Sequence, residues 1–509
     1  MTTTTAPLIG SNIQTLQPTS RTAEIATFGD SLAQKINGVR SATLTSYSST
    51  TGLATITSTG HGLTQGILQD FVIQGAPGFT AYDSPIVTVI DANTLTMVLP
   101  TGQGTIPTGA ASLTARQSYA ADHPHAWCSA ATRPNVTANF GVGSETTAQM
   151  LLRVDQAARC PQEVILVQAG TNDVGASVSY DTTASRIIDM CNTILAAGKT
   201  IILSPPAPRA STTVAIALIG LKLARALQEY AGTQSNVYFL DSYGAIADPA
   251  SLVGLARSGY MDSSSHYTQR GARAVGVLLQ TIYTKIFGGM SSNATVSGLD
   301  GFNATNNPLA DNIFANPNFL TATGGNVGSG TITGAIAAGV TLRLTGNGTF
   351  ILSGLCSVPA ASGGIGNCQQ FKATPAANGD VMRLTTEQVA SSVGLRMTAG
   401  EWRTAGWRVK TSGISAGNPV LSCLEFRLVI VSTGGTTTIV RDLSFGTRPT
   451  SSTEAEQVDY DQILQTPPFQ VPVGVTSCYL NLELQFLAAG TEITLEVSQP
   501  TLTKTSLRP

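Results

Sequence analysis

Short apolar runs separated by helical patterns are the feature that most constrains the fold of this chain. Four such runs end in turn residues: NVTANFG, EVILVQAG, TIILSPP and NVYFLDS, which begin at positions 135, 163, 200 and 236. Between and after them, apolar spacing predicts helices over 183–197, 213–230 and 269–286, the last with Thr268 as its N-cap. Buried strands that alternate with helices indicate a parallel sheet covered on both faces. In such sheets, ligands bind beyond the carboxyl ends of the strands.

Residues 41–116 interrupt this alternation. LATITS, LQDFVIQG, IVTVID and TLTMVL are short strand-like runs, and the last two are joined by the tight turn at 91–93. We therefore expect a small β-domain inserted after the first strand and its helix, which splits an α/β domain into 1–40 and 117–287. The TSTGHGLTQG segment resembles small β-modules that are common in phage structural proteins.

The character of the chain changes again after residue 287. Residues 288–312 are rich in Gly, Ser and Asn and are typical of a linker. Beyond them, apolar residues recur at every second position, as in Leu424, Phe426, Leu428 and Ile430, and in Leu480, Leu482, Leu484 and Phe486. Many half-buried strands without helices predict an all-β sandwich of the jelly-roll type over 313–509.

Composition excludes several classes of protein. At 509 residues, two or more domains are expected. Only 11% of the residues are charged and the net charge is −2, so nothing indicates a nucleic-acid partner. No apolar run reaches the about 18 residues that a membrane span needs, and the N-terminus MTTTTAPLIGSN lacks the pattern of a secretory signal.

The seven cysteines are scattered, without CxxC or zinc-type spacing, and most are expected to be buried thiols. Cys356 and Cys368 bracket a Gly-rich loop and could form a disulfide.

Ser31 lies in FGDSLA, on the first turn after the predicted strand IATFG. A serine hydroxyl is a poor nucleophile at neutral pH and needs an adjacent base. The G-x-S-x-G elbow of α/β-hydrolases is absent. Alone, the tripeptide Gly29-Asp30-Ser31 is more typical of a turn or a helix cap than of a nucleophile.

Three further segments change this interpretation, because each lies at a strand end or a helix start. They are NFGVGSETT with Gly141, QAGTNDVG with Asn172, and YMDSSSHYT with Asp262 and His266. In a parallel sheet these positions converge on one edge.

With these four blocks in order, the chain resembles the SGNH, or GDSL-type, hydrolase family over roughly 24–40 and 117–287. The resemblance implies a flavodoxin-like three-layer α/β/α fold and a serine esterase without a cofactor or a metal. Ser31 matches the nucleophile, His266 the base, and Asp262 the acid. Gly141 and Asn172 match the residues that, with the Ser31 N–H, stabilise the oxyanion.

Two departures from the family pattern leave alternatives open. Asp262 lies four residues before His266, whereas the family acid commonly lies three before, where this chain has Ser263. Either a one-residue bulge restores the contact, or a backbone carbonyl orients His266 and the site is a Ser–His dyad. The second block reads GVGSE where the family often has GVSG, which leaves the role of Gly143 open.

Other polar residues have structural interpretations. His61 lies in a turn of the insert, and packing is favoured for His123 and His125 in ADHPHAW. Asp30 and Asp173 are expected to anchor their loops through backbone hydrogen bonds. Trp407 alternates with Val409 and is expected in the core, whereas Trp402 could contact a sugar ring.

The favoured function is removal of O-acetyl or similar small acyl groups from a bacterial surface polysaccharide. The phage-like insert, and the NPNF and TLEVSQPTL segments that look like carbohydrate-binding jelly rolls, favour a phage tail spike or fibre enzyme, in the virion or extracellular. A homotrimer is compatible with this role. The alternatives are a general acyl esterase or lipase, and a catalytically silent receptor-binding adhesin.

Overall fold

The computed structural model describes the chain in segments. These are residues 24–34, 40–60, 69–73, 88–98, 101, 109–115, 122–128, 134–262, 265–288, 314, 319, 324–328, 336–345, 358–359, 367–386, 389–390, 396–415, 421–433, 437–442, 459, 461–466, 469–487, 489 and 491–504. The expected linker 288–312, apart from its first residue, and His61 lie outside the described residues.

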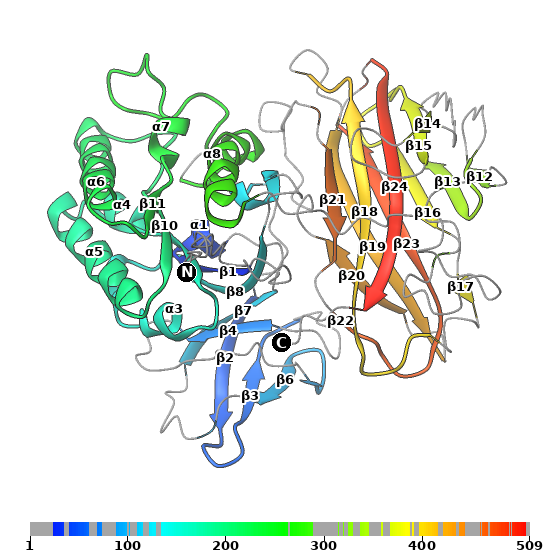
Figure 1. Cartoon of the computed structure of the whole chain (residues 1–509), viewed down its shortest axis with the longest axis horizontal. Helices are drawn as coiled ribbons and strands as arrows, with labels where there is room; N and C mark the ends of the chain where they lie inside the picture. Colours follow the sequence, from blue (N-terminus) through cyan, green and yellow to red (C-terminus); the bar gives the residue numbers. More distant parts are fainter. Residues whose placement is uncertain are drawn as a thin grey trace, which may run out of the picture.

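A five-stranded parallel sheet forms the first part of the molecule (Figure 1). Its strands are β1 (Glu24–Gly29), β8 (Asn135–Gly141), β9 (Val164–Gln168), β10 (Thr200–Ser204) and β11 (Val237–Phe239), in the order β11-β10-β9-β1-β8. The four apolar runs of the sequence and the run that precedes Ser31 thus supply its five strands, and the predicted parallel sheet is confirmed.

Helices cover this sheet through two apolar clusters. The helices are α1 (Ser31–Gln34), η1 (Pro124–Trp127), α2 (Thr147–Leu151), α3 (Asp155–Arg159), α4 (Thr171–Gly175), α5 (Tyr180–Ala196), α6 (Val214–Gly232), α7 (Ser242–Ile246) and α8 (Gln269–Phe287). One cluster joins Ile165 and Val167 of β9 with α5 and α6, and the other joins Leu166 of β9 with α8. Adjacent residues of β9 thus face opposite clusters, as strand geometry requires.

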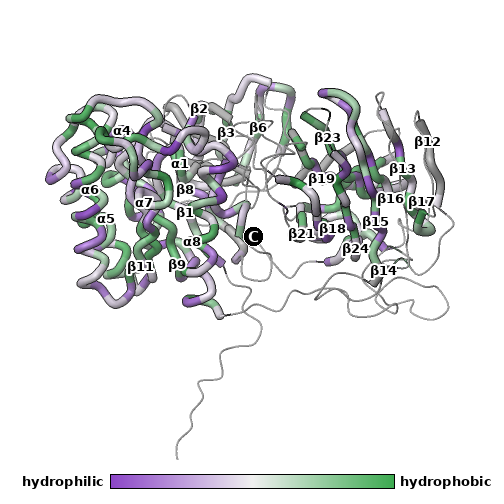
Figure 2. The backbone as a smooth tube through the Cα atoms, turned by 90° about the horizontal axis from the view of Figure 1, so that it is seen from above, coloured by the Kyte–Doolittle hydropathy of each residue, from purple (hydrophilic) through white to green (hydrophobic). Residues whose placement is uncertain are grey.

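The predicted long helices are confirmed within a few residues of their expected ends. Thr268 caps α8, because its side chain accepts a hydrogen bond from the Gly271 N–H. In Figure 2, α5 and α6 alternate between hydrophobic and hydrophilic positions, as expected for helices with one buried face.

The region of the expected insert is an antiparallel sheet. It contains β2 (Arg40–Tyr47), β3 (Leu53–Thr57), β4 (Gln69–Ile73), β5 (Thr88–Val89), β6 (Thr94–Val98) and β7 (Gly109–Ala115), in the order β4-β7-β2-β3-β6-β5. Its buried side chains include Leu44, Ile56, Leu95 and Met97. None of these four belongs to the two apolar clusters of the α/β sheet, so this region has a small core of its own.

The C-terminal part is rich in β-structure and forms two sheets. One contains β12 (Gly325–Gly328), β13 (Val340–Thr345), β16 (Val381–Thr386), β17 (Val389–Ala390), β19 (Leu421–Ser432), β20 (Thr437–Asp442) and β23 (Val475–Phe486). The other contains β14 (Val358–Pro359), β15 (Asn367–Ala373), β18 (Trp402–Ser412), β21 (Asp461–Gln465), β22 (Phe469–Gln470) and β24 (Ile493–Lys504).

Alternate residues of these strands are buried, as the period-two pattern predicted. Leu428 and Leu482 from the first sheet and Trp407 and Val497 from the second belong to one apolar cluster. Trp407 is fully buried, which confirms its predicted place in the core. Cys368 is a free buried thiol, and Cys356, its considered disulfide partner, lies outside the described residues.

Candidate active site

The turn that carries Ser31 is fixed by contacts of the two residues before it. β1 ends at Gly29, where a side chain would overlap the carbonyl oxygen of Gln168 on the neighbouring strand. Only glycine therefore allows β1 and β9 to approach this closely at their ends. The Asp30 N–H then donates to the same Gln168 carbonyl at 3.1 Å, and α1 begins at Ser31.

The structure brings Ser31, His266 and Asp262 into one chain of hydrogen bonds. The Oγ of Ser31 lies 3.0 Å from Nε2 of His266, although 235 positions separate the two residues. Nδ1 of the same imidazole lies 3.2 Å from Oδ2 of Asp262. This arrangement can move a proton from the serine hydroxyl to the imidazole while the carboxylate orients the ring.

The turn between Met261 and Tyr267 accommodates the unusual spacing of acid and base. The Asp262 N–H donates to the His266 carbonyl at 2.8 Å, and the His266 N–H donates to Oδ1 of Asp262 at 3.0 Å. An antiparallel bridge between Met261 and Tyr267 closes the turn. The carboxylate thus folds back onto its own turn and reaches the imidazole from four positions upstream.

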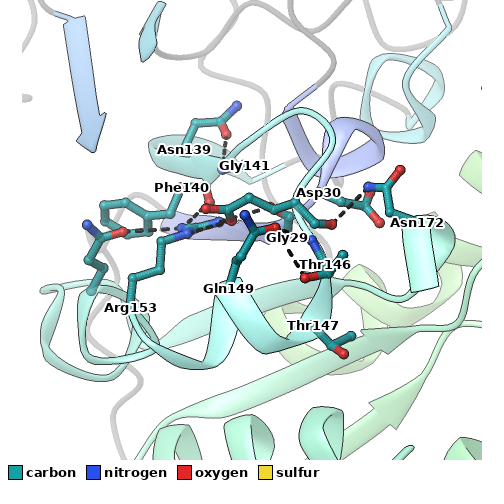
Figure 3. Close-up of polar contacts among 12 residues, drawn as sticks. Gly29, Asp30, Asn139, Phe140, Gly141, Thr146, Thr147, Gln149, Arg153 and Asn172 are labelled. Atoms are coloured by element: carbon teal, nitrogen blue, oxygen red, sulfur yellow. Dashed lines mark hydrogen bonds and ion pairs between the residues drawn. The ribbon is translucent and has the colours of Figure 1, made fainter. Parts of the chain in front are cut away.

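Asn172 lies beside the loop that follows β8 (Figure 3). It occupies the second position of α4, and its side-chain amide donates to the Glu145 carbonyl at 2.8 Å. Gly141, the last residue of β8, pairs with Gly29 in register. Its N–H donates to Oδ1 of Asn139 at 2.9 Å, and its expected role toward the oxyanion stays a prediction.

Two amides that the sequence did not assign lie in the turn between Gly141 and Glu145. Among the described residues, no acceptor is found for the N–H groups of Gly143 and Ser144. Ser144 has a φ of 65°, a left-handed conformation that is uncommon outside glycine. The side-chain amide of Asn172 bonds to the next carbonyl along the chain, that of Glu145. The open role of Gly143 was the only sequence signal for these two N–H groups.

Asp30 is a buried anchor of the site. Its carboxylate accepts from the Leu32 N–H at 3.0 Å and from the Thr171 N–H at 3.2 Å, which links the Ser31 turn to α4 and confirms its predicted role. Burial raises the pKa of Asp30 to about 6, while these two hydrogen bonds and the charge of His266 oppose the shift. The ionised form therefore costs the folded state free energy above about pH 6, and that cost disappears as the pH falls toward 3.8, the ordinary pKa.

Arg153 and Glu145 form a buried ion pair near the ends of β1 and β8 (Figure 3). The guanidinium of Arg153 bonds to the Glu145 carboxylate, with Nε 2.7 Å from Oε2, and both side chains are inaccessible to solvent. It also donates to the carbonyl of Phe140 at 2.7 Å and to that of Gly29 at 3.1 Å. Arg153 thereby ties the ends of β1 and β8 together, a role for which no sequence motif provides a signal.

The remaining polar residues have the structural contacts expected of them. Asp173 accepts from the N–H and hydroxyl of Thr147 at 2.8 and 2.7 Å. His123 and His125 are buried, and Nδ1 of His125 lies 3.0 Å from the Tyr283 hydroxyl on α8. Among the described residues, no three His, Cys, Asp or Glu side chains are grouped so that they could hold a metal ion. In the same part of the chain, no helix has the length and apolar content to cross a membrane.

A comparison with known protein families relates this part of the chain to one of them. Residues 109–274 match the model of the GDSL-like Lipase/Acylhydrolase family. This part of the chain is similar to GDSL-like hydrolases. The matched range includes Gly141, Asn172, Asp262 and His266, whereas Ser31 lies before it, on the other side of the insert. The GDSL-like family consists of ester hydrolases, which agrees with the Ser–His–Asp contacts. No curated protein matches the chain.

Several solved structures resemble parts of the chain at low identity. A GDSL-like lipase from Bacteroides thetaiotaomicron is 22% identical over 28% of this chain and 74% of its own, with a TM-score of 0.26. A lipolytic protein of the G-D-S-L family from Veillonella parvula is 16% identical over 30% and 82%, with a TM-score of 0.25. A carbohydrate esterase of family 3 from Talaromyces cellulolyticus is 16% identical over 30% and 72%, with a TM-score of 0.25.

Proposed function

We propose that this GDSL-like hydrolase removes O-acetyl or similar small acyl groups from a bacterial surface polysaccharide. The observation that carries the ester chemistry is the continuous hydrogen-bond chain from Ser31 through His266 to Asp262. A serine, an imidazole and a carboxylate in this order form the arrangement that activates a hydroxyl for acyl transfer.

The reaction follows from these contacts. Oγ of Ser31 attacks the ester carbonyl while Nε2 of His266 takes its proton. The carbonyl oxygen becomes an oxyanion, toward which the side-chain amide of Asn172 and the backbone N–H groups of Ser31 and Gly141 would turn. When the C–O bond of the ester breaks, the imidazolium returns the proton to the leaving sugar hydroxyl. Water then attacks the acyl-serine by the same route.

The accessibility of the site favours a large hydrophilic substrate. Ser31 is only half-buried, and the side chains of His266 and Asp262 keep 29% and 37% of their surface exposed. An ester that projects from a polymer can approach such a site without threading the polymer through the protein. Long acyl chains are instead favoured by enclosed apolar channels.

The finer architecture is part of the same proposal. We infer a flavodoxin-like α/β/α domain from residues 1–40 and 117–287, with residues 41–116 as an inserted β-domain. Residues 288–312 would be a linker, and residues 313–509 a carbohydrate-binding or assembly domain of the jelly-roll type. The phage-like insert motif supports a tail spike or fibre, with a homotrimer on the virion as the assembly.

Acetate release tests the proposal. Purified wild-type protein should release acetate from O-acetylated capsular or O-antigen polysaccharides, and Ser31→Ala should lower the rate by a factor on the order of 10³ or more. Hydrolysis of p-nitrophenyl acetate but not of a long-chain p-nitrophenyl ester would separate this function from that of a lipase. Polysaccharide binding without any turnover would contradict the esterase and favour an adhesin.

A further inference from the structure

Near the candidate active site lies an arginine, Arg209, that has no side-chain partner among the described residues. Arg209 is half-buried in the segment between β10 and α6, which leaves the sheet at the carboxyl end of β10. Its guanidinium makes no hydrogen bond or ion pair with any residue that the structure describes. By contrast, Arg257 nearby donates from Nε to the Ala247 carbonyl at 3.1 Å and lies over the ring of Tyr260. Toward the described part of the chain, Arg209 thus keeps its five N–H donors available.

The guanidinium of Arg209 lies on the face of α4 that carries Asn172. A Cβ at Gly175 would come within 2.8 Å of Nη1 and 3.5 Å of Cζ of Arg209, so the charged group occupies the space that a side chain at 175 would fill. Asn172 and Gly175 are three residues apart on this helix, and such positions are neighbours on one face, about 5–6 Å apart. The cation is therefore about one helical turn from the amide expected to bind the oxyanion.

The backbone of Arg209 is tied to the other half of the site. Its carbonyl accepts from the Ala256 N–H at 3.0 Å, and the chain continues from there to Asp262 and His266. The pKa of Asp30 is set by burial, by hydrogen bonds from Leu32 and from the backbone and side chain of Thr171, and by the charge of His266, and Arg209 is not among these influences. The arginine is thus no counter-ion to that carboxylate.

We propose that Arg209 binds a carboxylate on the substrate, so that the enzyme acts on acyl esters of acidic saccharides such as hexuronates. This inference rests on the proposed function and names its substrate class. A guanidinium presents paired N–H groups that match the two oxygens of a carboxylate. A sugar bound through this pair would hold its ester a short distance away, above Ser31. The carboxylates of Asp30 and Asp262 would otherwise repel such a substrate.

Matched sugar esters test this inference. The kcat/KM of wild-type protein is measured on three monoacetylated substrates that differ only at C6 of the sugar. They are methyl galactopyranoside, methyl galactopyranosiduronate and methyl galactopyranoside 6-phosphate. We expect the uronate to be preferred over the neutral ester, and Arg209→Gln to reduce that preference at least about tenfold. Gly175→Ala should reduce it as well, because its methyl group displaces the guanidinium without removing the charge. Arg257→Gln is the matched control and should keep the wild-type preference.

Each outcome has a separate meaning. Equal turnover of the neutral ester and the uronate, unaffected by Arg209→Gln, would overturn the inference and leave the sugar esterase standing. A preference for the 6-phosphate over the uronate that depends on Arg209 would overturn the assignment to a carboxylate. Hydrolysis of p-nitrophenyl acetate but of none of the three sugar esters would overturn the proposed function, and the inference with it.

Discussion

Asp262 orients His266 through three hydrogen bonds. The carboxylate of Asp262 contacts both Nδ1 and the backbone N–H of His266, and the Asp262 N–H donates to the His266 carbonyl. The ring is therefore held with Nε2 toward Ser31, in the tautomer that can accept a proton there. A carboxylate at Nδ1 also stabilises the imidazolium that forms during the reaction.

Replacing Asp262 with asparagine should separate a triad from a dyad. The asparagine can keep the bond to the His266 N–H, but its NH₂ group would face Nδ1 and favour the tautomer with a proton on Nε2. That tautomer cannot accept the Ser31 proton, so we expect kcat to fall by a factor on the order of 10² to 10⁴. The measurement is p-nitrophenyl acetate hydrolysis at saturating substrate.

Asp248→Asn is the control for that variant. Asp248 lies in the segment that leads to the site, and its Oδ1 accepts from the Ala250 N–H, a bond that asparagine can keep. Its kcat should match the wild type. If Asp262→Asn also retained nearly full kcat, the carboxylate would be dispensable and a Ser–His dyad would describe the site.

Single residues differ in how far the sequence could predict them. Ser31, Asn172 and His266 could be found because each follows a recognisable strand or precedes a recognisable helix. Arg153 could not, since it bonds to the carbonyl of Gly29, 124 positions earlier, and lies in no motif. Its role depends on which groups become buried together, and a single sequence does not contain that information.

Helices and strands with a clear periodicity of apolar residues were predicted from the sequence, and short helices held by their caps were not. β9 is buried at all five positions, and α5 has a clear apolar stripe, so both were predictable from the pattern. α2 and α7 are five residues each, too short to show a period. Local hydrogen bonds hold them instead, such as that from the Gly244 N–H to the Asp241 side chain.

The segment from α2 to α3 should depend on its buried ion pair. Arg153→Met leaves the Glu145 carboxylate buried without a cation, and burial of an uncompensated charge costs about 3–5 kcal/mol. Glu145→Gln should cost less, because its amide oxygen can still accept from the guanidinium. The measurement is the free energy of unfolding in urea, with acyl hydrolysis recorded in parallel because Asn172 bonds to the Glu145 carbonyl.

An exposed pair in α3 provides the comparison for this prediction. Arg159 and Asp155 lie 3.2 Å apart with side chains 64% and 43% exposed. Arg159→Met should therefore change the unfolding free energy by less than about 1 kcal/mol. If Arg153→Met cost no more than Arg159→Met, the buried pair would not stabilise the ends of β1 and β8 as argued.

The buried apolar side chains of the described residues form three regions. One joins α5 and α6 to the parallel sheet, and a second runs continuously from the α8 face of that sheet into the C-terminal sheets. The third is the small core of β2, β3 and β6. The α/β part and the C-terminal part lie side by side in Figure 1, and their shared cluster couples them. The apolar periodicity of the sequence predicted which part is α/β and which is β-rich. It could not predict that the two parts share one apolar cluster, because that depends on which faces meet in the folded chain.

This organisation predicts that the insert can lose stability without loss of catalysis. Ile56 is fully buried in the small core, and Ile56→Ala should remove about 2–5 kcal/mol from whatever unit contains it. Because that core lies outside both larger clusters, the loss should affect the insert alone. We expect an additional low-temperature unfolding transition by calorimetry, with kcat/KM on p-nitrophenyl acetate within about twofold of wild type at 20 °C.

Ile165→Ala is the matched variant, because Ile165 is equally buried but lies in β9, three positions before Gln168, whose carbonyl receives the Asp30 N–H. It should lower the main unfolding transition and the activity together, since the strand that positions the Ser31 turn is then less well packed. If Ile56→Ala reduced kcat/KM as strongly as Ile165→Ala, the insert would be part of the catalytic unit. Its separate core would then be a local feature of packing, with no independence in folding.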